Sequence, residues 1–266
     1  MASTDAAFSG SIPQIYDRYL AELLFNDFAR DIAVRTAAFS PKRILETAAG
    51  TGLATAVIVD LLPDAALTVT DLNQAMLDVA GQRVTSPKVE FQAADAQSLP
   101  FGDGDFDAVV MQFGMMFLPD RAAGYREALR VLGPGGRFIF NVWDGINKSP
   151  VAEVVHDSMA ALFPDDPPGF FTRVPWGYHD TARLEQDVRA AGFTDVGIAT
   201  VAATSRADSP ADAAIGLCQG TPLRAEIEAR GDLDQATQAA TEALIRRFGE
   251  GPIEQPLSAH AVTATK

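Results

Sequence analysis

The sequence predicts an α/β protein with a doubly wound, mostly parallel sheet. Three observations carry this prediction: short apolar runs alternate with segments of helical periodicity, a glycine-containing turn joins the first run to the first helix, and the fourth run is apolar at nearly every position. A strand that is apolar on both faces is typical of a parallel sheet covered by helices on each side. The length of 266 residues fits a single domain, which we expect over 1–266.

Helical cover is expected ahead of the first strand, within an N-terminal helical segment over 1–40. Between Pro13 and Phe39 apolar residues recur at the spacing of one helix face. The chain then alternates strands and helices, and Pro63 ends the first of these helices. The expected strands lie at 43–46, 67–70 and 89–91, and the expected helices at 53–62 and 74–84.

The second half continues the alternation, and the breaker cluster at 133–136 ends the helix after the fourth strand. The segment 144–180 is rich in proline and aromatic residues, and we expect it to be an inserted cap. The remaining helix, over 210–248, is expected to break near Gly220. The other expected strands lie at 106–111, 137–143, 196–201 and 257–265, and the other expected helices at 121–132, 151–163 and 181–191.

Composition excludes several classes of protein. The chain has 35 acidic and 21 basic residues and a net charge of −14, which disfavours a nucleic-acid partner. No apolar run is long enough for a membrane span and no secretory signal is present, so we expect no membrane partner and a cytoplasmic location. One cysteine, Cys218, and three separated histidines predict no disulfide and no metal site. A homo-oligomer stays open.

The turn Glu46–Gly52, with the sequence ETAAGTG, joins the first strand to the first helix. Gly50 and Gly52 allow the backbone to approach a ligand, and the helix start offers free N–H groups. The third glycine of the dinucleotide fingerprint is replaced by Thr55, which argues against a nicotinamide oxidoreductase. No Gly-Lys-Ser/Thr follows, so the turn is not a P-loop.

Four ordered motifs carry a resemblance: the turn, the acid in VTDLNQAML, the FQAADAQSLPF segment, and FDAVVMQFGMMFLPD leading to RVLGPGGRFIFNVWD. In this order the sequence resembles class I S-adenosylmethionine (SAM)-dependent methyltransferases of the small-molecule group that includes the ubiquinone-biosynthesis type (methyltransferase type 11 group), best over 43–143. It departs from the family at Ala48, the place of the first turn glycine. The resemblance implies a seven-stranded Rossmann-like sheet with an antiparallel last strand at 257–265, and SAM as the cofactor.

The acid that closes the second strand, Asp71, lies 19 residues after Gly52, the separation at which a carboxylate reaches both hydroxyls of a ribose. The resemblance implies the remaining cofactor contacts, at the adenine, at the methionine moiety and at the closure of the pocket. The alternatives are structural roles. Glu46 would then act on its own turn, Tyr16 and Tyr19 would be core residues, and the others would have ordinary structural roles. The predicted cofactor-binding residues are Tyr16, Tyr19, Glu46, Ala48, Gly50, Thr51, Gly52, Asp71, Leu72, Met76, Ala94, Asp95, Ala96 and Gln112.

The acceptor is expected to be a small, apolar or aromatic molecule. Aromatic residues and methionines of the cap and strand ends suggest such a pocket: Met115, Met116, Phe117, Trp143, Phe163, Phe170, Phe171, Trp176 and Tyr178. A general base is not assigned, and the candidates are His156, His179 and Asp144. The single cysteine argues against arsenite-type acceptors, and the run after the fourth strand differs from that of DNA amino-methyltransferases. The alternative is a non-catalytic SAM-binding regulatory or partner protein.

Overall fold

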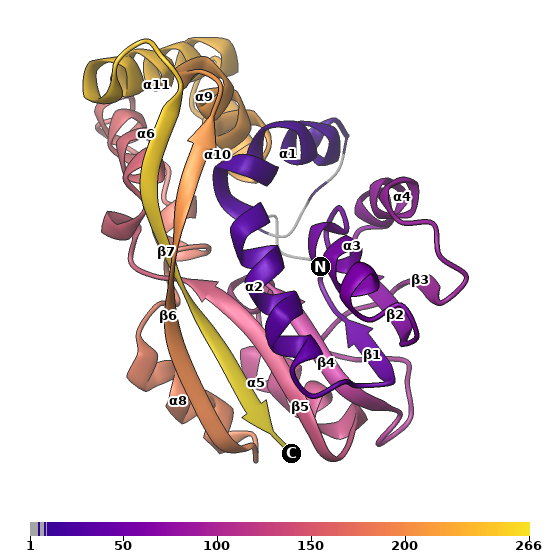
Figure 1. Cartoon of the computed structure of the whole chain (residues 1–266). Helices are drawn as coiled ribbons and strands as arrows, with labels where there is room; N and C mark the ends of the chain where they lie inside the picture. The colour runs from indigo at the N-terminus through magenta and orange to yellow at the C-terminus, as the bar shows by residue number, and fades with distance from the viewer. Residues whose placement is uncertain (1–4, 6–7, 9) are drawn as a thin grey trace.

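The sheet has seven strands in the order β3-β2-β1-β4-β5-β7-β6, and β7 alone runs antiparallel to its neighbours. This computed structural model describes residues 5, 8 and 10–266 of the chain. It confirms the predicted α/β class and the antiparallel last strand (Figure 1). The strands are β1 (Arg43–Glu46), β2 (Ala66–Asp71), β3 (Val89–Ala93), β4 (Phe106–Gln112), β5 (Leu132–Trp143), β6 (Thr194–Ala207) and β7 (Ile253–Thr265).

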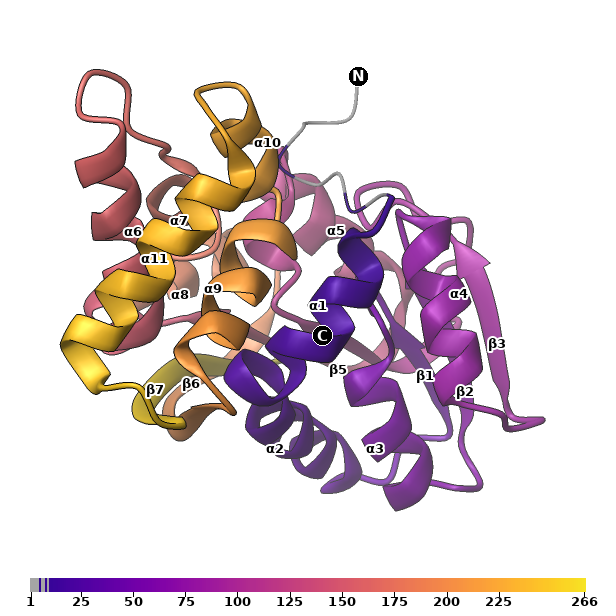
Figure 2. The same ribbon diagram turned by 90° about the horizontal axis from the view of Figure 1, so that it is seen from above.

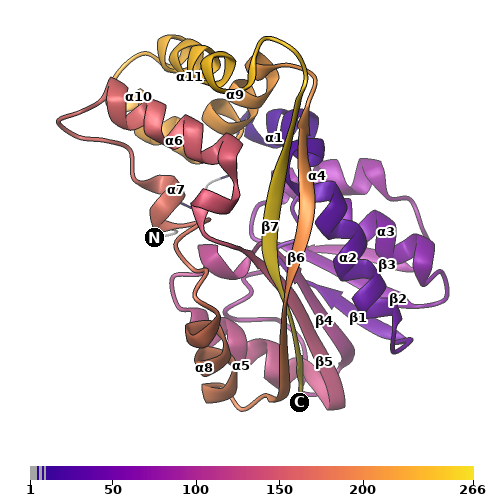
Figure 3. The same cartoon turned by 60° about the vertical axis from the view of Figure 1, so that its left-hand side comes forward.

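Helices cover both faces of the sheet and one of its ends. In Figures 1 and 3, α6, α9 and α11 lie beyond the carboxyl ends of the parallel strands, and they pack against one another. The helical segments are α1 (Ile12–Leu20), the π-helical turn η2 (Ala21–Phe25), α2 (Asn26–Ala37), α3 (Leu53–Leu61), α4 (Gln74–Arg83), η3 (Met115–Phe117), α5 (Arg121–Val131), η4 (Ile146–Lys148), α6 (Pro150–Leu162), α7 (Phe170–Arg173), α8 (Thr181–Ala190), α9 (Pro210–Gln219), α10 (Leu223–Glu228) and α11 (Leu233–Phe248).

Alternate strand residues build two hydrophobic cores, as the period of a strand requires. Ile44 and Val110 point to the face covered by α2 and α3, whereas Leu45 and Val109 point to the face covered by α5 and α8; all four are fully buried. Burial on both faces explains why the fourth strand is a nearly continuous apolar run.

The last two strands are longer than predicted. β6 and β7 pair from Thr194 with Thr265 to Ala207 with Ile253, and the half beyond Trp143 has no third strand beside it. That half is a two-stranded ribbon that reaches α9 and α11 (Figure 1). Its small and polar residues carry no apolar run, which is why periodicity did not predict it.

The strand order reverses at β1, because β2 and β4 lie on its two sides. A crevice forms outside the carboxyl ends of parallel strands at such a switch point. Figure 2 shows α1 lying across this end of the molecule, between α4 and α9. No helix among the described residues combines the length and apolarity that crossing a bilayer requires.

Candidate functional site

A cavity of about 410 Å³ opens at the carboxyl ends of β1, β2 and β4. One end is lined by the glycine turn and the ends of the first strands, and the other by aromatic residues of β5 and the cap and by Leu217 of α9. Ten of the predicted cofactor residues line it: Tyr16, Ala48, Gly50, Asp71, Leu72, Met76, Ala94, Asp95, Ala96 and Gln112. The other four are not among the described lining residues: Tyr19, Glu46, Thr51 and Gly52.

The Asp71 carboxylate holds the turn and also faces the cavity. It accepts hydrogen bonds from the backbone N–H groups of Gly50 (2.9 Å) and Asn73 (2.8 Å). Burial raises the pKa of Asp71, and the hydrogen bonds from Asn73 and Gly50 oppose this rise. Each carboxylate oxygen has two lone-pair sites, so Asp71 keeps capacity to accept a ligand hydroxyl.

The two turn glycines have different roles. A Cβ at Gly50 would meet nothing within 4 Å, and this residue lines the cavity with a φ of 56°. A Cβ at Gly52 would lie 2.9 Å from the Cβ of Ala80, so this glycine lets α3 approach α4. Only Gly50 leaves space for a ligand to reach the backbone.

Ala48 takes the place of a family glycine at a left-handed position with a φ of 51°. The neighbouring strand end compensates, because a Cβ at Gly114 would lie 2.6 Å from the Cβ of Ala48. The missing side chain at Gly114, in the loop after β4, therefore leaves room for the methyl group of Ala48.

Glu46 lies behind the turn and not in the cavity lining. Its Oε2 accepts the Thr55 hydroxyl hydrogen bond at 2.7 Å, and Oε1 has no partner among the described residues. Burial, opposed by the bond from Thr55, raises the pKa of Glu46 to about 7. This geometry favours the reading in which Glu46 acts on its own turn: it ties the end of β1 to the first turn of α3.

Leu72 and Met76 supply apolar surface beside Asp71. Leu72 is 50% exposed, which is unusual for a large apolar side chain, and it lines the cavity. Facing them, Asp95 binds the backbone N–H of Gln97 at 2.8 Å. An exposed apolar wall next to a carboxylate with spare acceptor capacity fits a nucleoside.

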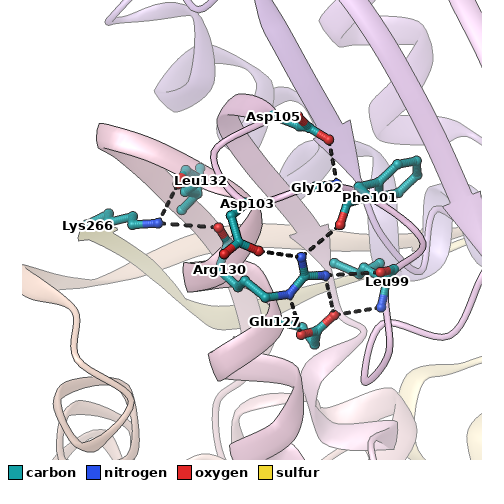
Figure 4. Close-up of polar contacts among 9 residues, drawn as sticks. All are labelled: Leu99, Phe101, Gly102, Asp103, Asp105, Glu127, Arg130, Leu132 and Lys266. Atoms are coloured by element: carbon teal, nitrogen blue, oxygen red, sulfur yellow. Dashed lines mark hydrogen bonds and ion pairs between the residues drawn. The ribbon is translucent and has the colours of Figure 1, made fainter.

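Arg130 anchors the loop that follows this segment (Figure 4). Its guanidinium donates to two backbone carbonyl groups and two carboxylates: those of Leu99, Phe101, Asp103 and Glu127. Glu127 in turn accepts the backbone N–H of Leu99 at 2.7 Å. Two arginines near it in the sequence, Arg121 and Arg137, instead lie over the rings of Tyr178 and Phe39.

The N-terminal helices reach the cavity through Tyr16, which stacks on Phe25 with ring centroids 4.9 Å apart. Phe8 packs edge-on against Tyr16 and also lines the cavity. Gln112 donates from Nε2 to the Phe25 carbonyl at 3.1 Å, which fixes η2 to the end of β4. Tyr19 instead packs α1 against α9, because a Cβ on Gly216 would lie 2.9 Å from its Cβ.

The far end of the cavity is aromatic. Five of the residues expected to form an apolar acceptor pocket line it: Phe117, Trp143, Phe170, Phe171 and Trp176. The others lie elsewhere: Met115 and Met116 are core residues, Phe163 packs near Gly231, and the Tyr178 hydroxyl donates to Asp187. Among the described lining residues, Asp71 and Asp95 are the acidic ones, and both are at the opposite end.

The three candidate bases are outside the described cavity lining. His179 is exposed and its Nδ1 contacts the Trp176 carbonyl at 2.8 Å. Asp144 lies 3.4 Å from the Nε2 of His260 and accepts the Ser258 hydroxyl hydrogen bond at 2.8 Å. His156 is half-buried on α6.

Several lining residues were not predicted from sequence. Asn73 follows Asp71 and Leu72 directly, and that adjacency was a usable signal. Six more lie within two positions of predicted residues that line the cavity: Gln97, Phe113, Gly114, Leu118, Pro119 and Pro175. The rest come from segments remote from the motifs, and no local motif marks them: Phe8, Leu20, Leu24, Phe25, Leu217, Thr221 and Pro222.

Comparisons with known proteins agree with this geometry. Residues 45–140 match the family model described as a methyltransferase domain. A demethylmenaquinone methyltransferase of Clavibacter sepedonicus is 41% identical over 99 residues, which are 37% of this chain and 40% of the relative. A ubiquinone/menaquinone biosynthesis C-methyltransferase of Methylobacterium nodulans is 39% identical over 111 residues, 40% of this chain and 44% of the relative. The chain thus spans less than half the length of these relatives.

Solved structures share the fold. The YcgJ protein from Bacillus subtilis superposes with a TM-score of 0.58 at 20% identity, covering 90% of this chain and 98% of that one. The cyclase SpnF superposes with a TM-score of 0.57 at 21% identity, covering 91% of this chain and 81% of that one. Residues 45–140 therefore belong to the methyltransferase domain family, whose methyl donor is SAM, and the sheet order and the solved structures show the class I methyltransferase fold.

Proposed function

We propose that this protein transfers a methyl group from SAM to a small, apolar or aromatic acceptor. The observation that carries the proposal is the continuity of one cavity, which joins the Asp71 and Gly50 end to the aromatic end around Trp143 and Phe171. A transfer enzyme needs both partners in one enclosure from which water is excluded.

When bound, SAM supplies a methyl group for an in-line displacement, in which the acceptor nucleophile bonds to the methyl carbon as the bond to the positively charged sulfur breaks. Asp71 would accept from the ribose hydroxyls, with Leu72 and Met76 packing on the adenine and the 94–96 segment at its amino group. The turn from Ala48 to Gly50, with Gln112, would hold the methionine end. The two acidic lining residues, Asp71 and Asp95, lie at the cofactor end of the cavity, and their charge favours binding of a cation such as SAM.

The aromatic end supports an acceptor that needs no enzymatic base. The titratable side chains among the described lining residues are Tyr16, Asp71 and Asp95, all at the cofactor end. The seven residues outside the described set are Met, Ala, Ser and Thr, which carry no titratable side chain. An acceptor that ionises in water, such as an acidic phenol, would arrive with its electron pair available, and its proton would go to solvent.

The test is a screen of phenols, enols, thiols and amines with SAM, with S-adenosylhomocysteine measured as product. We expect turnover with uncharged or weakly acidic aromatic compounds. Turnover confined to highly charged acceptors would contradict the proposal, because the aromatic end offers such groups no partner.

The competing proposal is a non-catalytic SAM-binding protein. The likeness to a structure described as a cyclase shows why the fold alone does not decide between them. The discriminating result is cofactor binding without product from any acceptor in the screen. The open aromatic half of the cavity favours the enzyme, because a purely regulatory site has no need of it.

A further inference from the structure

Three aromatic rings form a column along the acceptor end of the cavity. Phe113 stacks on Trp143 with centroids 3.7 Å apart and planes 9° apart, and Trp143 stacks on Trp176 at 5.7 Å and 24°. All three residues line the cavity. Phe113 follows β4, Trp143 ends β5, and Trp176 belongs to the cap, so the column joins the sheet to the cap.

A buried polar side chain holds each end of this column. At one end, Asn141 Oδ1 accepts the backbone N–H of Phe113 at 2.8 Å. Phe113 has a φ of 51°, a conformation that a bulky side chain rarely adopts and that needs support from its surroundings. The Nδ2 of Asn141 has no hydrogen-bond partner among the described residues. The bond to the Phe113 N–H is therefore the hydrogen bond that the Asn141 side chain makes at this position.

At the other end, the Ser149 hydroxyl accepts the indole N–H of Trp176 at 3.0 Å. Ser149 occupies the N-cap position of α6, where a serine normally binds a backbone N–H of the helix, yet its side chain makes no such bond. The hydroxyl therefore serves the column instead of the helix. Asn141 and Ser149 are 1% and 2% exposed, so water does not compete for either bond.

The size of the cavity limits what can lie against the column. Sites for a single small-molecule ligand span about 300–1,000 Å³. A cavity of about 410 Å³ lies toward the lower end of this range, and it must hold an acceptor as well as a nucleoside cofactor, which favours a small acceptor. Packed aromatic rings held at both ends cannot easily separate to admit a wider one.

We propose that the column Phe113–Trp143–Trp176 sets the width of the acceptor site for a single flat ring, and that Asn141 and Ser149 are positioning residues that keep that width. The proposal rests on the proposed function and narrows it to single-ring acceptors. Neither positioning residue touches the acceptor: Asn141 acts through the backbone of Phe113, and Ser149 acts through the indole of Trp176.

The column contains both tryptophans of the chain, so its own fluorescence reports ligands that contact it. Phenol and 1-naphthol would be titrated into protein saturated with S-adenosylhomocysteine, and Kd taken from the quenching of emission. We expect phenol to bind about tenfold more tightly than 1-naphthol. Naphthol has the greater apolar surface and would bind more tightly if apolar burial alone set the affinity. A preference for phenol therefore reports exclusion by size.

The variants test the positioning role. Ser149→Ala and Asn141→Ala should each reduce the preference for phenol about threefold or more, with the Kd for S-adenosylhomocysteine unchanged by calorimetry. Ser149→Thr keeps the hydroxyl and should restore the preference. Thr36→Val is the matched control, because it removes a buried hydroxyl bond to the Ile32 carbonyl (2.8 Å) outside the cavity lining. If Asn141→Ala does not fold, the Ser149 pair decides alone.

The possible outcomes are distinct. Equal or tighter binding of 1-naphthol, or a preference that Ser149→Ala leaves unchanged, would overturn the role of the column. Absence of quenching by both probes, with S-adenosylhomocysteine still bound, would also overturn it while leaving the cofactor site intact. Absence of S-adenosylhomocysteine binding would instead contradict the proposed function.

Discussion

The buried carboxyl of Glu46 gives a sharp prediction, because its replacement by glutamine changes charge at nearly constant shape. The Glu46 side chain is 0% exposed, and one oxygen accepts the Thr55 hydroxyl hydrogen bond at 2.7 Å. The carbonyl oxygen of a glutamine can accept the same bond. Glu46→Gln therefore reproduces the protonated state of the wild-type residue at every pH.

The magnitude follows from the pKa, which burial raises from 4.5 to about 7. Between these two values the folded protein keeps a proton that the unfolded chain has lost, so stability falls as pH rises through the folded pKa. Each pKa unit corresponds to about 1.4 kcal/mol, which makes the penalty at pH 8 about 3 kcal/mol. Glu46→Gln should therefore be more stable than wild type by up to about 3 kcal/mol at pH 8, and by about 1 kcal/mol at pH 5.5.

Urea unfolding without cofactor, followed by tryptophan emission at the two pH values, measures this difference. The lower value is kept above the isoelectric point of about 4.5. Glu127→Gln is a control of opposite sign, because the hydrogen bond from Arg130 holds the pKa of Glu127 below its usual value. That variant should lose stability at pH 8. A Glu46→Gln variant that is less stable than wild type at pH 8, or a difference independent of pH, would refute the reasoning.

Three further predictions concern the turn, its supports and the acceptor chemistry. Arg130→Ala should cost about 2 kcal/mol in urea unfolding and weaken cofactor binding, because the loop after Gln97 loses its anchor; unchanged stability would contradict this. Gly114→Ala should destabilise the protein by about 1–3 kcal/mol through its approach to Ala48, and adding Ala48→Gly should recover part of that loss in a double-mutant cycle; additive effects would argue against the compensation. Replacing the candidate bases by His156→Ala, His179→Ala or Asp144→Asn should leave the pH dependence of kcat/KM set by the pKa of the acceptor; a shifted profile in one variant would identify it as a base.

Local chemistry made the sheet and its cofactor end predictable from sequence. Asp71 ends an apolar run and Gly50 belongs to a turn between a strand and a helix, and parallel strands bring such ends together. Ten of the predicted cofactor-binding residues line one cavity, and their role in binding the cofactor stays a prediction.

The acceptor end was only partly predictable, because its lining depends on contacts between distant segments. Trp176 and Phe171 could be expected from the composition of the cap, but Leu217 reaches the cavity only because the long β6–β7 ribbon places α9 there. The roles of Asn141 and Ser149 have no sequence signal, since each depends on a single bond made in the folded protein.

The most direct test of the central claim is calorimetric titration of SAM into wild-type protein and Asp71→Ala, with thermal melting to show that both are folded. The cavity predicts one site per chain with micromolar-range affinity in the wild type. It predicts a loss of about tenfold or more in the variant, because the carboxylate both addresses the ribose and holds Gly50. No heat in the wild type, or equal affinity in the folded variant, would contradict the claim that this cavity is the SAM site.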